Sequence, residues 1–318
     1  MKHIFVSLAL DTAKGLGFIA ASMAIFAAIS MLWFRLSPRL KHDGGVKRAI
    51  DYAFPRKLYA RPGAKVDLGL MILNTFFFGP AISLFATLFA ALDLTQVLVA
   101  HFGRPAISVQ NSWVILTVQF LVGTLSGELS FYAYHRLTHK NRFFWTTHRV
   151  HHSAEEMTFL TGGRGHPLDG VGFVLSRVII AAPLNGIGLY FTGVAAHPLL
   201  PTVLLAYGIF SGVENAFNHS HVPSSFGPLN YIFISGHMHQ IHHSSEIRHR
   251  DKNFGATMSL FDWIFRTLYI PRAGETPRLG LNGDQLGENN PHQSVRDCLL
   301  EPIVYLKDQI HQRSRAGG

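Results

Sequence analysis

Five stretches of this 318-residue chain are long and apolar enough, or nearly so, to cross a lipid bilayer. A spanning helix needs about 20 mostly apolar residues, because its backbone polar groups must pair with one another inside hydrocarbon. The pattern therefore predicts an all-α integral membrane protein with about four to five transmembrane helices. The expected spans are 16–34, 68–92, 113–134, 171–191 and 199–217.

The distribution of charge predicts how the spans are oriented. Only 15% of the residues are charged and the net charge is +9, and in so apolar a chain clustered Lys and Arg report membrane topology rather than nucleic-acid binding. Nine Lys and Arg residues lie within 35–67, whereas 93–112 holds one Arg. The positive-inside rule places 35–67 in the cytoplasm. Alternation of the spans then places 135–168 and 218–318 on the same cytoplasmic face and the N-terminus outside.

Three regions follow from these patterns. Residues 1–110 hold the first spans and the basic loop, and Arg35 directly after the first apolar run favours a retained span over a signal peptide. Residues 111–271 carry the histidine motifs. Residues 272–318 form a cytoplasmic tail, with a Gly-, Pro- and Asn-rich loop followed by one amphipathic helix over 294–312. The single cysteine, Cys298, excludes an internal disulfide and a four-thiolate metal site.

Dense histidine motifs recur beside the apolar segments. The chain has 19 histidines, and 14 of them fall between His135 and His249. The motif HRVHH at 148–152 returns as HQIHH at 239–243, after HRLTH at 135–139. Residues three or four apart share one helix face, so their imidazoles can reach a common ion. The candidate metal ligands are His135, His139, His148, His151, His152, His239, His242 and His243.

A further candidate ligand, His219, follows the fifth apolar segment. His221 stands two residues later, and a spacing of two does not share a helix face, so we expect only one of this pair to bind metal. Eight or nine imidazoles exceed the four ligands of one zinc and fit two ions. Imidazole suits zinc, copper, iron and nickel. Carboxylates are scarce near the motifs, which leaves a cationic site and favours binding of O₂ over activation of water.

The order of these motifs resembles the fatty acid hydroxylase / sterol desaturase superfamily of integral membrane di-iron enzymes. The segment from Arg164 to Asp169 (RGHPLD) resembles the Arg-x-His-Pro-Leu-acid element of that family, and 217–220 (FNHS) resembles its aromatic-x-His-Ser element. Asn253-Phe254-Gly255, followed by Asp262, resembles two further signatures. The resemblance covers about residues 115–270. His221, where the family commonly has Asn, and the additional His237 are departures from the pattern.

The resemblance implies a non-haem di-iron centre held by the eight histidines of the three motifs together with His219. Such a centre uses O₂ and external electrons to hydroxylate or desaturate a C–H bond of a lipid-like substrate, either fatty acyl, sterol or related. No catalytic residue beyond the metal ligands is implied, and zinc can replace iron in a purified sample. Because the chain has no dinucleotide-binding or haem motif, the electrons are expected from a separate reductase with a ferredoxin or cytochrome.

Several other polar residues are candidates for orienting the ligands. Glu128 and Asp169 can accept hydrogen bonds from ligand N–H groups, although Glu128 is as readily explained as a residue that snorkels to the membrane interface. His166, His221, His237 and Asn253 complete this set. Two other functions stay open at this point: a divalent-metal transporter, and a metal-binding membrane protein without oxygenase activity.

Overall fold

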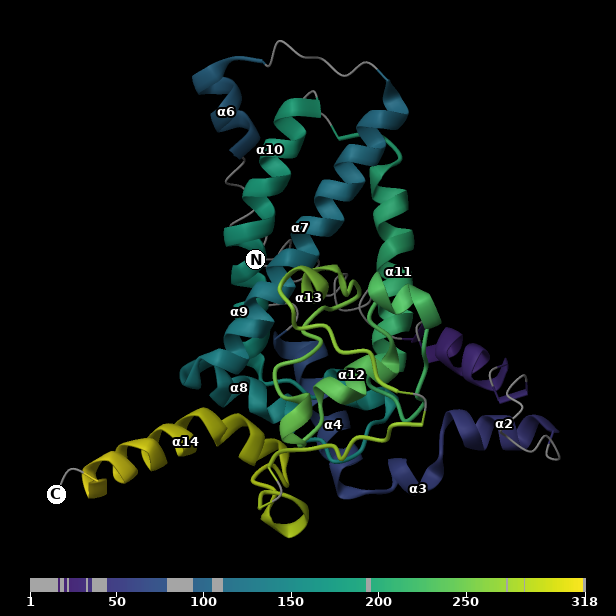
Figure 1. Cartoon of the computed structure of the whole chain (residues 1–318), viewed down its shortest axis with the longest axis vertical. Helices are drawn as coiled ribbons and strands as arrows, with labels where there is room; N and C mark the ends of the chain where they lie inside the picture. The colour runs from purple at the N-terminus through teal and green to yellow at the C-terminus, as the bar shows by residue number, and fades with distance from the viewer. Residues whose placement is uncertain are drawn as a thin grey trace, which may run out of the picture.

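A computed structural model of the chain describes residues 45–78, 94–104, 111–192, 196–272, 274–282 and 284–316, and also 17, 20–21, 23–32 and 34–35. No strand occurs in these ranges; isolated bridges pair Phe233 with Met258 and Ser244 with Leu279. The described part is therefore all-helical, as the apolar pattern predicts. Figure 1 shows a long helical bundle that stands on a wider base of short helices and loops.

Four helical stretches of the described residues form the bundle. These are α6 (Leu94–Phe102), α7 (Ser112–Lys140), α11 (Leu200–Asn218) and one continuous helix made of α9 (Pro167–Ser176), the π-helical turn η3 (Arg177–Ala181) and α10 (Ala182–Thr192). Asn111 begins α7, because its side-chain oxygen accepts hydrogen bonds from the first backbone N–H groups of the helix. Pro167 begins α9 at a position where a missing N–H costs nothing.

Two of the described helices are long and apolar enough to cross a membrane, namely α7 and the continuous helix Pro167–Thr192. They coincide with the expected spans 113–134 and 171–191. The expected span 199–217 is helical in α11, which is not one of those two helices. The expected spans 16–34 and 68–92 lie partly outside the described residues, and the described Met23–Leu32 is a shorter apolar helix. The total of four to five spans stays a prediction.

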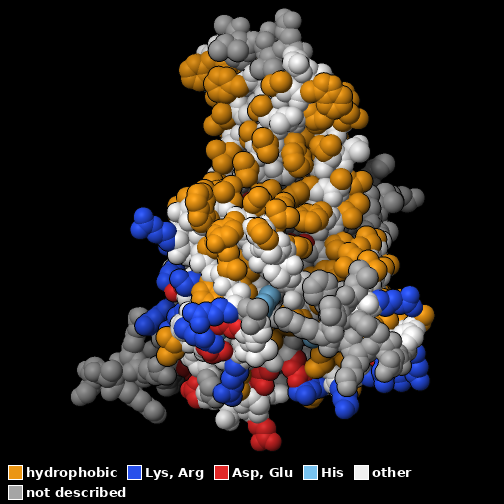
Figure 2. Space-filling view, turned by 45° about the vertical axis from the view of Figure 1, so that its right-hand side comes forward, with side chains coloured by type: hydrophobic (Ala, Val, Ile, Leu, Met, Phe, Trp, Pro, Cys, Tyr) orange, Lys and Arg blue, Asp and Glu red, His pale blue; other side chains and the backbone are white. Residues whose placement is uncertain are grey.

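The base is assembled from short elements around α8 (Arg142–His152) and α12 (Gly236–His242). Figure 2 shows hydrophobic side chains over the bundle, whereas Lys, Arg, Asp and Glu gather over the base. The other elements are α2 (Gly45–Ala53), α3 (Arg56–Tyr59), α4 (Pro62–Leu73), η1 (Asn74–Phe78), η2 (Phe159–Gly163), η4 (Gly227–Tyr231), η5 (Ile247–His249), α13 (Leu260–Ile264), η6 (Gly287–Asn289) and α14 (Val295–Ala316).

Helix α14 corresponds to the amphipathic helix expected over 294–312. Its first turns pack on α8 and α4, where Cys298 joins a buried cluster with Val66, Leu70 and Val150. Glu301 of α14 accepts a hydrogen bond from the Arg149 guanidinium of α8 at 2.6 Å, and both side chains are buried. The regions before 111 and after 271 thus touch the histidine-bearing part directly, and their status as separate domains stays a prediction.

Candidate metal centre

The nine histidines expected as ligands lie together at the end of the bundle that meets the base, in two adjoining clusters. Within each cluster, one nitrogen from every histidine lies within 4.8 Å of the others. The C-terminal end of α7, α8, α12 and the residue that ends α11 supply these side chains. The first cluster is His135, His139, His148, His152 and His242, and the second is His151, His219, His239 and His243.

Each of the two HxxHH motifs is divided between the clusters. On α8, His148 and His152 face the first cluster, whereas His151 faces the second. On α12 the assignment is reversed, because His242 belongs to the first cluster while His239 and His243 belong to the second. The clusters meet where the rings of His152 and His243 stack with their centroids 4.4 Å apart. Shared helix faces therefore predicted the proximity of the imidazoles but not their division between two sites.

The spacing of the ring nitrogens suits metal coordination. Nε2 of His152 lies 3.2 Å from Nε2 of His148, and Nε2 of His239 lies 2.9 Å from Nε2 of His219. Two nitrogens bound to one ion at about 2.1 Å are roughly 3.0 to 3.4 Å apart in octahedral or tetrahedral geometry. The Nε2 atoms of His135, His139 and His242 are buried without a hydrogen-bond partner. Buried lone pairs without donors are costly, and a bound cation would satisfy them.

Backbone carbonyls fix the orientation of several of these rings. Nδ1 of His135 donates to the Phe254 carbonyl at 2.7 Å, and Nδ1 of His242 donates to the Lys252 carbonyl at 2.7 Å. Because a carbonyl oxygen only accepts, each Nδ1 carries the proton and each Nε2 keeps a free lone pair. Hydrogen bonds of this kind commonly orient histidines that bind metals.

The charge state of the rings also favours metal binding. Burial lowers the pKa of His219 to about 4 and the pKa of His242 to about 3. Burial, together with the neighbouring histidines, also holds the pKa values of His151, His239 and His243 well below the usual range. These imidazoles are therefore neutral at neutral pH, which is the form that binds a metal.

Asp169 lies where an acceptor for a ligand N–H was expected. Its Oδ2 is 2.8 Å from Nδ1 of His148, and its Oδ1 accepts a hydrogen bond from the Tyr134 hydroxyl at 3.1 Å. Pro167 starts α9 two residues earlier, so the aspartate stands in the first turn of that helix, facing the first cluster. The carboxylate thus orients His148 while Tyr134 orients the carboxylate.

Glu128 and Asn253 shape the backbone beside the clusters. Glu128 is 7% exposed and is therefore buried within the protein. Its Oε2 accepts from the backbone N–H groups of Thr257 and Met258. Among the described residues, no hydrogen bond joins Glu128 to a cluster histidine. The side chain of Asn253 bonds to backbone groups of Met238 and Tyr269 and thereby holds the chain beside Phe254.

Three further candidate residues, His166, His221 and His237, lie outside both clusters. His166 caps α9 through a hydrogen bond from the Leu168 N–H at 3.1 Å. His221 donates from Nε2 to the Tyr52 carbonyl, and His237 does the same to the Glu275 carbonyl. The structure therefore places His219, and not His221, beside the other histidines, as the spacing of two predicted.

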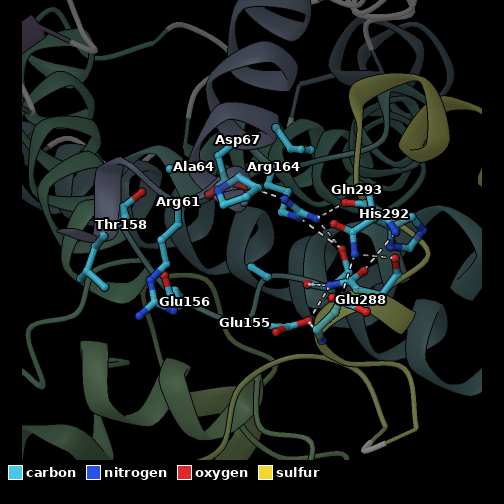
Figure 3. A pocket seen from close by; sticks show the side chains of 18 residues that line it. Arg61, Ala64, Asp67, Glu155, Glu156, Thr158, Arg164, Glu288, His292 and Gln293 are labelled. Carbon is cyan, nitrogen blue, oxygen red and sulfur yellow. Dashed lines mark hydrogen bonds and ion pairs between the residues drawn. The ribbon is translucent and has the colours of Figure 1, made fainter. Parts of the chain in front are cut away.

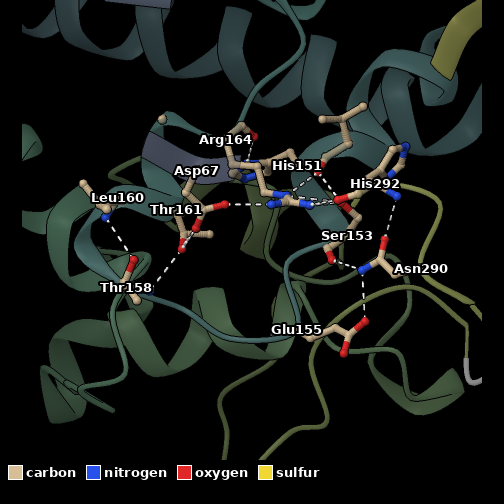
Figure 4. A network of polar contacts seen from close by, with 12 residues as sticks. Asp67, His151, Ser153, Glu155, Thr158, Leu160, Thr161, Arg164, Asn290 and His292 are labelled. Carbon is tan, nitrogen blue, oxygen red and sulfur yellow. Dashed lines mark hydrogen bonds and ion pairs between the residues drawn. The ribbon is translucent and has the colours of Figure 1, made fainter. Parts of the chain in front are cut away.

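Arg164 and Asp67 form a support for the second cluster that sequence reasoning missed. The buried Arg164 guanidinium donates to Asp67 at 2.8 Å, to the Ser153 hydroxyl at 2.8 Å and to the Val150 carbonyl at 3.0 Å (Figure 4). The Arg164 carbonyl in turn accepts from Nδ1 of His151 at 3.0 Å. In the sequence, the only sign of this pair is that Asp67 stands at the edge of an apolar segment. Its partner Arg164 can be recognised only in the fold.

Two cavities with shared lining residues lie between the bundle and the clusters. A cavity of about 420 Å³ is lined by His135 and His148 of the first cluster and by His151, His219 and His239 of the second. A further cavity of about 760 Å³ lies between α7, the η3–α10 segment and α11. The two share the lining residues Phe131, Arg177, Ser211, Asn215 and Ala256.

Two polar cavities lie in the base. One, of about 400 Å³, reaches His139, His152 and His242 of the first cluster and is also lined by Lys140 and Arg142. The other, of about 340 Å³, lies behind Arg164 between charged side chains that include Arg61, Glu155 and Glu288 (Figure 3), and no cluster histidine lines it. The first cluster is thus accessible from a polar side as well as from the apolar cavity.

Comparison with known proteins identifies the part of the chain that carries the clusters. Residues 120–267 match the fatty acid hydroxylase family. This part of the chain, slightly less than half of it, is similar to the fatty acid hydroxylase family. The match contains all nine cluster histidines together with Asp169 and Arg164. No solved structure matches the chain.

Several proteins of named activity are similar to this chain over 142 to 190 residues. The chain is 27% identical over 190 residues to an ornithine lipid hydroxylase of Rhizobium tropici, covering 58% of this chain and 53% of that one. It is 26% identical over 154 residues to an alkylglycerol monooxygenase of Caenorhabditis elegans, covering 48% and 28%. A methylsterol monooxygenase of Rattus norvegicus is 28% identical over 142 residues, covering 43% and 41%. The chain therefore spans about half or less of the length of these relatives.

Proposed function

We propose that this protein is a membrane-bound non-haem di-iron oxygenase that hydroxylates a C–H bond of a lipid-like substrate with O₂ and external electrons. The proposal rests on one cavity, mostly apolar, that is lined by histidines of both clusters. The relatives named as lipid hydroxylases and monooxygenases support the same chemistry. Desaturation by the same ligand set is the related alternative.

In this proposal the five histidines of the first cluster hold one iron ion and the four of the second hold the other. Iron supplies the redox chemistry that a C–H bond requires and that no side chain can provide. The protein orients the ligands, because Asp169 and the carbonyls of Phe254, Lys252 and Arg164 fix the rings. The 420 Å³ cavity gives a lipid-like substrate access to both clusters. Zinc in a purified sample would be a replacement for iron.

Two alternatives are less well supported. A divalent-metal transporter needs its ligands in mid-membrane, at interrupted helices, whereas these histidines lie at the ends of α7 and α11 and in α8 and α12. A metal-binding protein without enzymatic activity would not need the 420 Å³ cavity beside both clusters. Electrons would come from a separate reductase with a ferredoxin or cytochrome. The other proposed partners are O₂ and membrane lipids.

The test is incorporation of ¹⁸O from ¹⁸O₂ into lipids. Membranes containing the wild-type protein or the His242→Ala variant are supplied with a reductase, a ferredoxin and NADPH, and the extracted lipids are analysed by mass spectrometry. We expect a lipid that gains one ¹⁸O atom with the wild-type protein only. Loss of two hydrogens without a gain of oxygen would assign desaturation instead. An unchanged lipid profile, from protein loaded with two irons, would contradict the proposal.

A further inference from the structure

One positively charged side chain, Arg177, lies in the walls of the two cavities between the bundle and the clusters. It lines both the 420 Å³ cavity and the 760 Å³ cavity, and among the described residues no other Lys or Arg lines either of them. It is also the only Lys or Arg of the apolar helix Pro167–Thr192, which is long enough to cross a membrane. Charged residues in such helices are costly and usually face a protein interior or a cavity, where they often serve function. The position of Arg177 therefore indicates a role in these cavities.

The neighbours of Arg177 on the helix show that it faces the cavities and not the lipid. Residues three or four apart share a helix face, and one such face lines the larger cavity with Val174, Arg177, Val178, Ala181, Ala182 and Asn185. In contrast, Ile179, Ile187 and Phe191 line neither cavity and are exposed, as expected of side chains that face lipid. The π-helical turn η3 begins at Arg177, and turns of this kind are frequent at functional sites.

The guanidinium of Arg177 has no partner in the described part of the chain. Its side chain is exposed, and no hydrogen bond or ion pair joins it to another described residue. Each carboxylate in the two cavity walls already accepts a hydrogen bond from another side chain, in the pairs Glu128–Tyr207, Glu214–Asn218 and Asp169–Tyr134. Arginine has five N–H donors and no acceptor, so Arg177 can bind a ligand that brings acceptors and negative charge.

Asn215 adds a second donor where the cavities adjoin. It lines both cavities, and its side-chain amide makes no hydrogen bond among the described residues. Ser211 also lines both, but its hydroxyl is engaged with the Thr257 hydroxyl at 2.6 Å. The planar guanidinium matches the paired oxygens of a carboxylate or a phosphate, and an amide NH₂ can donate to the same kind of oxygen. The shared walls of the two cavities therefore offer donors for an anion.

We propose that Arg177, with Asn215 in the same cavity walls, binds the anionic group of an amphiphilic ligand, either a carboxylate or a phosphate ester. The hydrocarbon part of such a ligand fits the larger cavity, where Val174, Val178 and Leu204 contribute apolar walls. This inference rests on the proposed lipid oxidation and adds the charge of the substrate to it. The lipid that reaches the clusters is anionic, and its charged group lies within the cavities.

Two substitutions of Arg177 give different expectations. Arg177→Gln removes the positive charge but keeps a polar side chain with N–H donors, so the variant should lose affinity for anionic ligands and keep it for neutral ones. Arg177→Lys keeps the charge but not the planar fork of donors, so it should reduce the preference for anions without abolishing it. Arg266→Gln is the matched control, because Arg266 is exposed, lies outside both cavities and loses the same charge.

The experiment measures the binding of tritiated palmitate, hexadecyl phosphate and 1-hexadecanol, which share one chain length, to purified protein in a non-ionic detergent without O₂. The pH is chosen so that the carboxylate and the phosphate are ionised. We expect the wild-type protein to bind an anion about tenfold more tightly than the alcohol, the effect of one hydrogen bond to a charged group. Arg177→Gln should abolish this preference and still bind the alcohol, which also shows that the variant is folded. Arg266→Gln should keep the preference.

Equal binding of anions and alcohol by the wild-type protein, or an unchanged preference in Arg177→Gln or Arg177→Lys, would overturn the assignment. An anion bound by metal ions in the clusters would leave the preference unchanged in these variants, so the experiment separates Arg177 from the clusters. Tighter binding of palmitate assigns a carboxylate, and tighter binding of hexadecyl phosphate assigns a phosphate ester. No turnover is needed, so an anion preference without lipid oxidation would reject only the proposed function. Oxidation without an anion preference would reject only the role of Arg177.

Discussion

At the scale of single residues, the notable feature is that neighbours on one helix turn serve different clusters. His148 and His151 are three residues apart on α8, but His148 faces the first cluster and His151 the second. Different groups also orient them, since Asp169 lies against His148 whereas the Arg164 carbonyl accepts from His151. The two positions should therefore be separable by experiment although they belong to one motif.

Single substitutions should remove one metal ion at a time. We expect His148→Ala to release the ion of the first cluster and His151→Ala the ion of the second, each leaving about one ion per chain by elemental analysis. His221→Ala is the control and should retain both ions, because His221 bonds to the Tyr52 carbonyl outside the clusters. Loss of both ions in either cluster variant would show that the sites are not independent.

The buried pair of Asp67 and Arg164 should matter for stability and for the second cluster. Asp67→Asn leaves a buried guanidinium without its anionic partner, which costs about 3 kcal/mol. The variant should unfold at a lower temperature and should lose the ion of the second cluster before that of the first. Thermal unfolding with metal analysis measures both effects, and a variant with wild-type stability would contradict the role given to this pair.

Residue types and spacing predicted much of this site, but not all of it. The sequence identified all nine cluster histidines: six lie in the two HxxHH motifs, two lie in HRLTH at 135–139, and His219 follows the fifth apolar segment. The spacing of two correctly predicted that only one of His219 and His221 joins a cluster. The division of each motif between two clusters depends on how α8 and α12 face each other across the base. The hydrogen bonds of Glu128 to Thr257 and Met258, and of Arg164 to Asp67, join residues about 100 or more positions apart. Spacing along the chain carries no information about such contacts.

At the scale of elements, α14 packs against α8, the helix that carries His148. The motif helix α8 also carries Arg149, and Glu301 of α14 pairs with this arginine in a buried site. His292 lies 3.1 Å from the other oxygen of the same carboxylate. The amphipathic pattern predicted a surface helix but could not show which charged residue it would bury.

Glu301→Ala should therefore destabilise the base. Arg149 would lose its ionic partner in a buried site, and a loss of about 3 kcal/mol in the free energy of unfolding is expected. Asp308→Ala, an exposed acidic position on the same helix, is the control and should change stability by less than about 0.5 kcal/mol. Equal thermal unfolding temperatures for the two variants would contradict the account of α14.

At the scale of the whole molecule, both clusters lie at one end of the bundle. Charge asymmetry predicted that 135–168 and 218–318 share a membrane face, and the fold brings the histidines of both segments into contact. The number of spans and the cytoplasmic side remain predictions, because the first two expected spans lie partly outside the described residues. The hydrophobic surface of the bundle and the charged surface of the base agree with a base outside the bilayer (Figure 2).

A reporter fused after Pro271 tests the orientation. We expect green fluorescent protein at this position to fluoresce and alkaline phosphatase to be inactive, because the positive-inside rule puts the base in the cytoplasm. A fusion after Gly318 should report the same side. Active phosphatase at Pro271 would reverse the predicted topology, although it would not affect the geometry of the clusters.

The central claim is that the two histidine clusters hold two iron ions in each chain. The most direct measurement is Mössbauer spectroscopy combined with elemental analysis of protein produced with ⁵⁷Fe. The account predicts two irons per chain, both in nitrogen-rich environments, and about one in His148→Ala and in His151→Ala. A wild-type protein that binds a single iron, or none under conditions that load iron fully, would contradict it.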